Sequence, residues 1–126
     1  MAGNGSVAEV KNYRELVVWK RSMELVAETY RLVKYLPKEE TYALSNQIRR
    51  AVVSIPSNIA EGNGHGTTKD YARFLAMARG SKYELETQLL ICVDLGYLTN
   101  EQIVKAMMLS DEIGRMLNVI ITKLGE

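Results

Sequence analysis

Apolar residues recur every three or four positions along most of the chain, the spacing that gathers them on one face of an α-helix. Between Arg14 and Leu36 this pattern predicts a first helix, which Pro37 ends. Its apolar positions form a seam and a second stripe beside it: Leu16, Trp19, Met23, Val26, Tyr30 and Val33, then Val18, Leu25, Leu32 and Leu36. Because the two stripes together cover a wide arc, we expect this helix to pack against two neighbours.

The second predicted helix runs from Glu40 to Glu61. Its core stripe consists of Leu44, Ile48, Val52, Ile55 and Ile59. Pro56 falls inside this stripe and lacks the N–H that would bond the Val52 carbonyl. Since the apolar phase continues past the proline, we expect a kink and not a break. Gly62 is the expected stop after the helix.

The third predicted helix begins at Thr67 or Thr68 and ends near Gly96, and a fourth opens at Thr99 with Gln102 completing a capping box. Their core stripes are Tyr71, Phe74, Ala78, Leu85 and Cys92, then Ile103, Ala106, Ile113, Leu117, Ile120 and Leu124. Four amphipathic helices with short connections predict an all-α fold, an antiparallel up-down-up-down four-helix bundle over residues 13–126. Residues 1–12 are expected to form a disordered leader.

Composition adds limits to this picture. The chain has 126 residues, enough for one domain, and its single cysteine leaves no internal disulfide. The first nine residues have neither the basic nor the apolar region of a signal peptide, and no apolar run is long enough to cross a membrane. We therefore expect a cytoplasmic protein with no membrane contact.

Charge is unevenly distributed along the chain. Residues 10–82 hold thirteen basic and seven acidic side chains, whereas residues 83–126 hold three and seven. Such asymmetry suits self-association or binding to an anionic partner, although both halves can also be solvated faces. The candidate nucleic-acid contacts, acting through phosphates with little reading of sequence, are Lys20, Arg21, Arg31, Lys34, Arg49, Arg50, Lys69 and Arg73.

The residues that enzyme chemistry requires are scarce. The di-iron sites of four-helix bundles need two Glu-x-x-His pairs, and this chain has one histidine, His65, and no such pair. Cys92 falls on a core-facing stretch, where a neutral packed thiol is expected. Glu84 and Glu86 are two positions apart and point in different directions. We expect no catalytic residue, no metal and no cofactor, and hence no enzyme.

The glycine-rich segment from Gly62 to Gly66 resembles a phosphate-cradling loop. Phosphate loops of that kind follow a β-strand, and none is predicted before this one. A flexible connection between helices is the more typical interpretation. Lys69 and Arg73, one helical turn apart on the next helix, leave an anion-contacting corner as the alternative.

Polar residues form an unusual stripe on the second helix and a cluster in the middle of the third. The stripe consists of Arg50, Ser54, Ser57, Asn58 and Glu61, and the cluster of Arg79, Gly80, Ser81 and Glu84. A glycine in mid-helix costs about 1 kcal/mol relative to alanine, so Gly80 suggests close approach by another helix. One alternative is a polar clasp between these two helices, and the other is a subunit interface or ligand-facing surface.

Several strings in the chain are specific enough to resemble a known family. They are Ser54 to Gly62 (SIPSNIAEG), Ala78 to Ser81 (ARGS), Glu84 to Gln88 (ELETQ), Leu16 to Trp19 (LVVW) and Gln47 to Ala51 (QIRRA). Together they resemble the four-helix-bundle family of the 23S rRNA intervening-sequence protein, and the resemblance extends from Leu16 to Leu124. The accessory variability protein of diversity-generating retroelements is related to this family.

The resemblance implies several properties. Most members have no established activity, relatives form homopentamers, and the retroelement accessory protein partners a reverse transcriptase and binds nucleic acid through a basic surface. Ten signature positions are implied to be structural or to form interfaces: Ser54, Pro56, Ser57, Asn58, Glu61, Gly62, Arg79, Gly80, Ser81 and Glu84. His65 stands where many members have a basic residue, which weakens an anion site in that loop at neutral pH.

Two hypotheses for function follow. The first is a non-enzymatic, homo-oligomeric accessory protein, a pentamer by resemblance, that associates with RNA or DNA through a basic surface. The second is a scaffold that binds another protein and has no nucleic-acid role, suggested by the wide apolar arc of the first helix.

Overall fold

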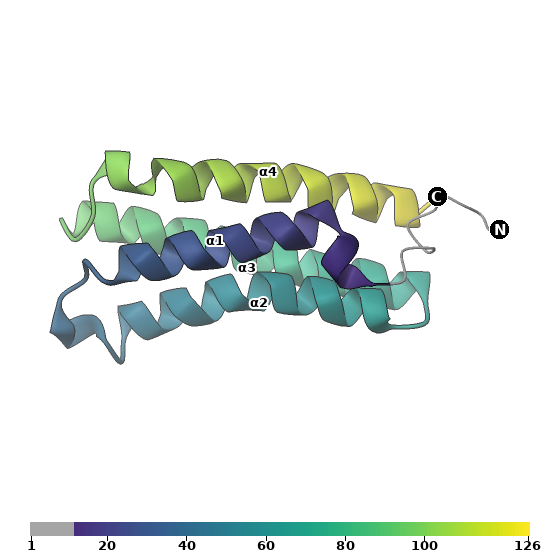
Figure 1. The fold of residues 1–126 in the computed structure, drawn as a ribbon, viewed down its shortest axis with the longest axis horizontal. Helices are drawn as coiled ribbons and strands as arrows, with labels where there is room; N and C mark the ends of the chain where they lie inside the picture. The colour runs from purple at the N-terminus through teal and green to yellow at the C-terminus, as the bar shows by residue number, and fades with distance from the viewer. Residues whose placement is uncertain (1–11) are drawn as a thin grey trace.

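The structure is a computed structural model that describes residues 12–126 (Figure 1). Its elements are η2 (Tyr13–Glu15), α1 (Val17–Val33), η3 (Lys38–Glu40), α2 (Leu44–Gly64), α3 (Thr68–Asp94) and α4 (Asn100–Leu124). The chain reverses direction at each connection, so each helix lies antiparallel to the next. This confirms the all-α four-helix bundle. The expected leader lies outside the described residues except for Asn12, which caps η2.

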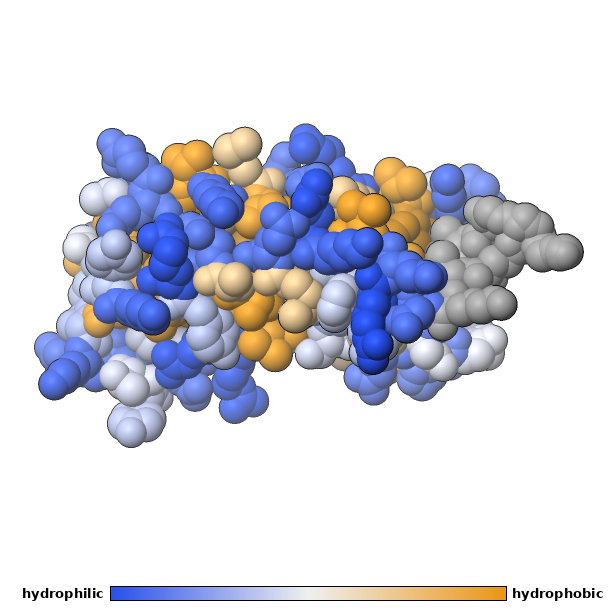
Figure 2. Space-filling view, viewed as in Figure 1, coloured by the Kyte–Doolittle hydropathy of each residue, from blue (hydrophilic) through white to orange (hydrophobic). Residues whose placement is uncertain are grey.

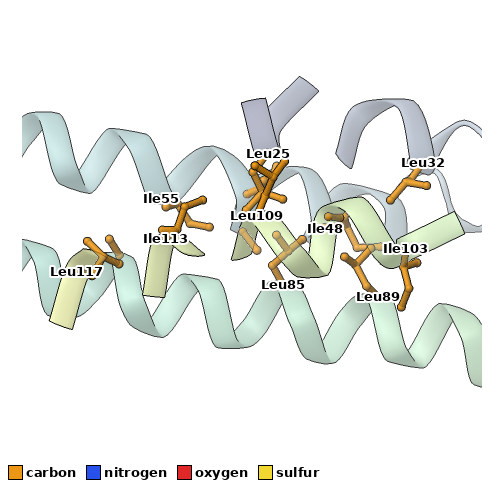
Figure 3. Packing of buried hydrophobic residues seen from close by; sticks show 14 of the residues in the cluster. Leu25, Leu32, Ile48, Ile55, Leu85, Leu89, Ile103, Leu109, Ile113 and Leu117 are labelled. Carbon is orange, nitrogen blue, oxygen red and sulfur yellow. The ribbon is translucent and has the colours of Figure 1, made fainter. Parts of the chain in front are cut away.

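Each helix packs against two neighbours, in the cyclic order α1, α2, α3, α4. The expectation that the first helix contacts two others is therefore confirmed. Large aliphatic side chains from all four helices meet along the axis of the bundle, as Figure 3 shows. No helix among residues 12–126 is long and apolar enough to cross a membrane.

The first helix is shorter than the sequence pattern suggested. A separate 3-10 turn, η2, precedes it, Leu16 is extended, and α1 starts at Val17 and ends at Val33. The second stripe supplies the core, with Leu25 and Leu32 fully buried. The seam is partly exposed to solvent, since Met23 is 44% and Tyr30 is 41% exposed. Periodicity finds both stripes, but only the placement of α2 and α4 decides which of them faces the centre.

The second helix begins at Leu44, later than expected, and continues through Pro56 without a break. Four of its five core positions, Ile48, Val52, Ile55 and Ile59, are fully buried. The prediction that Gly62 stops the helix is wrong, because α2 extends to Gly64. Gly62 is instead a packing position: a Cβ there would lie 2.6 Å from the Cβ of Phe74 on α3.

The remaining helix ends agree with the sequence. Thr67 caps α3 by accepting a hydrogen bond of 3.1 Å from the backbone N–H of Asp70. Gly96 ends this helix in the left-handed region, with φ of 80°. Thr99 and Gln102 form the predicted capping box at the start of α4, bonding each other's backbone N–H groups at 2.8 and 3.1 Å.

Candidate nucleic-acid interface

The eight basic residues proposed from the sequence do not gather into one patch. Four lie at the end of the bundle where α1 connects to α2: Arg31, Lys34, Arg49 and Arg50. The other four lie toward the opposite end, where α2 connects to α3: Lys20, Arg21, Lys69 and Arg73. The antiparallel packing of the helices produces this division, which the linear charge count does not reveal.

Three of the eight already have acidic partners within the chain. Arg21 lies 2.6 Å from Glu24 and 3.3 Å from Glu112, and the hydrogen bonds that its guanidinium donates to these carboxylates raise its pKa. Arg31 pairs with Glu28 at 2.6 Å and Arg73 pairs with Asp70 at 3.5 Å. The arginines of these pairs are largely exposed, although Glu28 is buried. Exposed ion pairs contribute little to stability, but they neutralise positive charge that would otherwise attract a phosphate.

The other cations are available to a partner. Among residues 12–126, no acidic group lies within ion-pair distance of the exposed side chains of Lys20, Lys34, Arg50 and Lys69. Arg49 has a structural role as well, because its guanidinium donates a bond of 3.1 Å to the Thr41 carbonyl. Of these four candidates, Lys34 and Arg50 lie at the end where α1 connects to α2, and Lys20 and Lys69 lie toward the opposite end.

A polar clasp joins α2 to α3 at mid-height. The hydroxyls of Ser54 and Ser81 lie 2.7 Å apart, and the amide of Asn58 donates to the Ser54 hydroxyl and to its carbonyl, both at 2.9 Å. The clasp between the two helices is therefore confirmed for Ser54 and Ser81, and Asn58 supports it from within α2. Arg50 and Glu84 line a cleft over the serine pair, whereas Ser57 faces the groove between α1 and α2.

Gly80 does not meet another helix within the chain. It is exposed, and a Cβ built on it meets no atom of the described residues within 4 Å. The prediction of close backbone approach is therefore wrong within the bundle. Its neighbour Arg79 turns to the other side of α3 and donates a bond of 2.8 Å to Asn118 on α4.

Sequence reasoning missed a buried charged network between α3 and α4. Lys82 is 6% exposed, its ammonium lies 2.8 Å from Glu86, and the hydroxyl of Ser110 donates to the same carboxylate at 2.5 Å. Gly114 makes room for the lysine, since a Cβ there would lie 2.4 Å from the Lys82 Cε. The available signal was the spacing of Ser110 and Gly114, two small residues one turn apart on the otherwise apolar buried face of α4.

The groups with potential for acid–base or nucleophilic chemistry occupy ordinary structural positions. Cys92 is fully buried, and this burial raises the pKa of its thiol to about 11. The ring of His65 lies 4.8 Å from the Phe74 ring and 3.9 Å from the Asp70 carboxylate. Glu84 lines the cleft toward α2 and Glu86 accepts from Ser110 on α4, so the two point in different directions, as expected from their spacing. Within the described part of the chain, no three His, Cys, Asp or Glu side chains gather where they could hold a metal ion.

Fold and surface together define a small four-helix-bundle protein that is tied by hydroxyl and ion-pair contacts between helices and carries unpaired cations at both ends. The model of the 23S rRNA-intervening sequence protein family matches residues 14–119, so the chain belongs to this family. It is also similar to the crystal structure of a protein of unknown function from the S23 ribosomal protein family of Bacteroides thetaiotaomicron. The two are 31% identical with a TM-score of 0.77, over 83% of this chain and 98% of that one. No curated protein matches the chain.

Proposed function

We propose that this chain is a non-enzymatic accessory protein that assembles with copies of itself and binds RNA through basic side chains. The observation that carries the proposal is that four of the eight candidate cations, Lys20, Lys34, Arg50 and Lys69, are exposed and have no acidic partner among the described residues. Cations of this kind replace the counterions of nucleic-acid phosphates, and the release of those counterions favours binding. Because the chain belongs to a family named for an intervening sequence of 23S rRNA, we take RNA as its anionic partner.

The proposal contains no catalytic step. At neutral pH the buried thiol of Cys92 is protonated and is not a nucleophile. His65, the single histidine, stacks on Phe74 and faces Asp70. The side chains on the surface are suited to holding a partner rather than transforming one.

Assembly is supported by apolar surface that the bundle leaves open. On α1, Met23 and Tyr30 remain partly exposed. Met23 and Val53 of α2 border a groove that also contains Trp19 and Pro56. Figure 2 shows apolar side chains interrupting the charged surface on this side of the molecule. A ring of five subunits, as the resemblance implies, would repeat each pair of cations and raise affinity through multivalency.

Charge reversal at each end of the bundle tests RNA binding. One variant is Lys34→Glu with Arg50→Glu, the second is Lys20→Glu with Lys69→Glu, and the matched control is Lys105→Glu with Lys123→Glu on α4. All three change net charge equally at exposed positions. Fluorescence anisotropy with a labelled structured RNA should show about tenfold weaker binding for at least one of the first two, and a smaller change for the control. Equal effects in all three would remove the basic surfaces as the binding site.

A protein-binding scaffold is the second candidate, and the same groove between α1 and α2 favours it. A wild-type protein that binds no RNA at low salt, yet forms a stable assembly by light scattering, would place this candidate first. A monomer across micromolar concentrations would contradict the assembly that both candidates include.

A further inference from the structure

The connection between α1 and α2 exposes aromatic rings to solvent. Tyr42 is 94% exposed and Tyr35 is 55% exposed, while Tyr30 on the last turn of α1 is 41% exposed. We call residues 30–50, from this turn to the second turn of α2, the α1–α2 corner. Burial of an aromatic ring is strongly favourable, so several open rings in one short segment suggest a surface that is covered by a partner.

The same corner concentrates positive charge. Five basic residues against two acidic ones lie within residues 30–50: Arg31, Lys34, Lys38, Arg49 and Arg50, against Glu39 and Glu40. The carboxylate of Glu40 is engaged, since it accepts bonds from the hydroxyl of Tyr97 at 2.8 Å and from the backbone N–H of Leu44 at 3.3 Å. Lys34, Lys38 and Arg50 have no acidic partner in the described chain.

Internal hydrogen bonds hold the corner in place. The backbone N–H of Tyr35 donates to the Leu32 carbonyl at 3.0 Å, and that of Thr41 donates to the Lys38 carbonyl at 3.0 Å. Arg49 reaches back from α2 to the Thr41 carbonyl at 3.1 Å. The two open tyrosines therefore stand on turns that are ordered before any partner arrives, which lowers the entropic cost of binding.

Among residues 12–126, the aromatic rings at the opposite end of the bundle are buried or half-buried. There Tyr13 packs edge-on against Trp19, with ring centroids 5.3 Å apart, and the half-buried Trp19 lines the groove between α1 and α2. Phe74 is 8% exposed and stacks with His65. Cations occur at both ends, but in the described part of the chain the α1–α2 corner is the end that combines them with solvent-exposed aromatic rings.

We propose that the α1–α2 corner binds single-stranded RNA, with unpaired bases stacking on Tyr35 and Tyr42 and phosphates contacting Lys34, Lys38 and Arg50. Aromatic platforms set among cations are how proteins hold single strands without reading sequence, because every base offers a flat face. Bases in a duplex are stacked on each other and are not open to these rings. This inference rests on the proposed function and narrows it to one end of the bundle and to unpaired RNA.

Tyrosine variants test the stacking. Tyr35→Ala with Tyr42→Ala removes both rings, Tyr35→Phe with Tyr42→Phe keeps them, and Tyr83→Ala is the matched control, because Tyr83 is as exposed as Tyr35 but lies on α3. Binding to a labelled single strand of about twelve nucleotides is measured by anisotropy, beside a duplex and a DNA strand of the same sequence. The double alanine variant should bind the RNA strand about tenfold more weakly, while the phenylalanine variant and Tyr83→Ala bind as wild type.

The outcomes of these measurements distinguish base stacking on Tyr35 and Tyr42 from RNA binding in general. Unchanged single-strand binding by the double alanine variant, with weaker binding by Lys34→Glu/Arg50→Glu, would overturn the stacking and leave RNA binding intact. Equal loss on duplex and single strand, or tighter binding of the DNA strand, would also overturn it. Absence of RNA binding by the wild-type protein would overturn both. Because both tyrosines are open to solvent, circular dichroism should show all variants folded.

Discussion

The hydroxyl of Tyr97 donates a hydrogen bond of 2.8 Å to the carboxylate of Glu40, across 57 positions of sequence. Tyr97 lies in the connection between α3 and α4, and Glu40 ends η3 in the connection between α1 and α2. Both connections are at the same end of the bundle, so this bond joins its two turns (Figure 1). Together with the bond from Arg49 to Thr41, it fixes the position of the α1–α2 corner.

Tyr97→Phe should therefore lower stability in a pH-dependent way. The bond to Glu40 raises the pKa of the Tyr97 hydroxyl above its ordinary value. A group whose pKa is raised by folding stabilises the protein below its unfolded pKa, about 10 for tyrosine, and loses that contribution as pH rises through the folded pKa. Urea denaturation should show wild type more stable than Tyr97→Phe at pH 7, with the difference shrinking above about pH 10. A difference that stayed constant would exclude the bond as its source.

The pair of Lys82 and Glu86 should be costly to break from the side that leaves the buried lysine alone. Glu86→Leu leaves the 7% exposed ammonium of Lys82 without its acidic partner, whereas Lys82→Met leaves the 22% exposed carboxylate of Glu86 with the hydroxyl of Ser110 and with solvent. Removing one member of a buried ion pair typically destabilises a protein by about 3 kcal/mol or more. Replacing both, with Lys82→Met and Glu86→Leu, should recover a large part of that loss. Urea denaturation of the two single variants and the double variant checks this, and additive losses would show that the pair is not coupled.

Gly62 and Gly64 offer a matched pair of substitutions at the end of α2. Alanine at position 62 would bring its Cβ 2.6 Å from the Cβ of Phe74 and 3.3 Å from the Tyr71 carbonyl. Separating α2 from α3 to relieve this should destabilise the fold by about 1–3 kcal/mol. Alanine at position 64 meets no atom within 4 Å and should leave stability nearly unchanged. Thermal denaturation of both variants measures how much stability each substitution costs, and equal losses would contradict the packing role of Gly62.

Cys92 should react slowly in the folded protein. With its pKa raised to about 11, the thiol is almost entirely protonated at pH 8. Relative to the ordinary value of 9.0, the thiolate fraction falls by about 100-fold, and burial restricts access further. A thiol reagent at pH 8 should modify native protein at least about 100-fold more slowly than protein in denaturant. Rapid modification without unfolding would place this cysteine outside the core.

Local rules in the sequence predicted most of the fold. The period of apolar residues located four helices, and Thr67, Thr99 and Gly96 marked helix ends because capping depends on neighbouring backbone atoms. The prediction for Gly62 was wrong because its role depends on a distant neighbour. In the sequence, a glycine that allows another helix to approach looks the same as a glycine that ends a helix. In α1, periodicity found two stripes without ranking them, since only the packed neighbours determine which is buried.

The candidate site was less accessible from the sequence. A count of basic residues overlooks the acidic partners of Arg31 and Arg73, which lie three positions away on the same helix. The bond from Arg21 to Glu112 joins α1 to α4 and depends on the packing of the bundle. The open rings of Tyr35 and Tyr42 lie in a connection, where no periodic pattern indicates whether a side chain is buried. The pair of Lys82 and Glu86 has the spacing of an exposed ion pair, and only its position opposite Gly114 reveals that it is buried.

RNA binding is the central claim, and its salt dependence is the most direct test. The measurement is fluorescence anisotropy of a labelled structured RNA with wild-type protein, titrated at several salt concentrations from low to near-physiological. We predict binding at low salt that weakens steeply as salt rises, with a slope that reports how many phosphates are contacted. No binding at low salt, or binding indifferent to salt, would contradict the account.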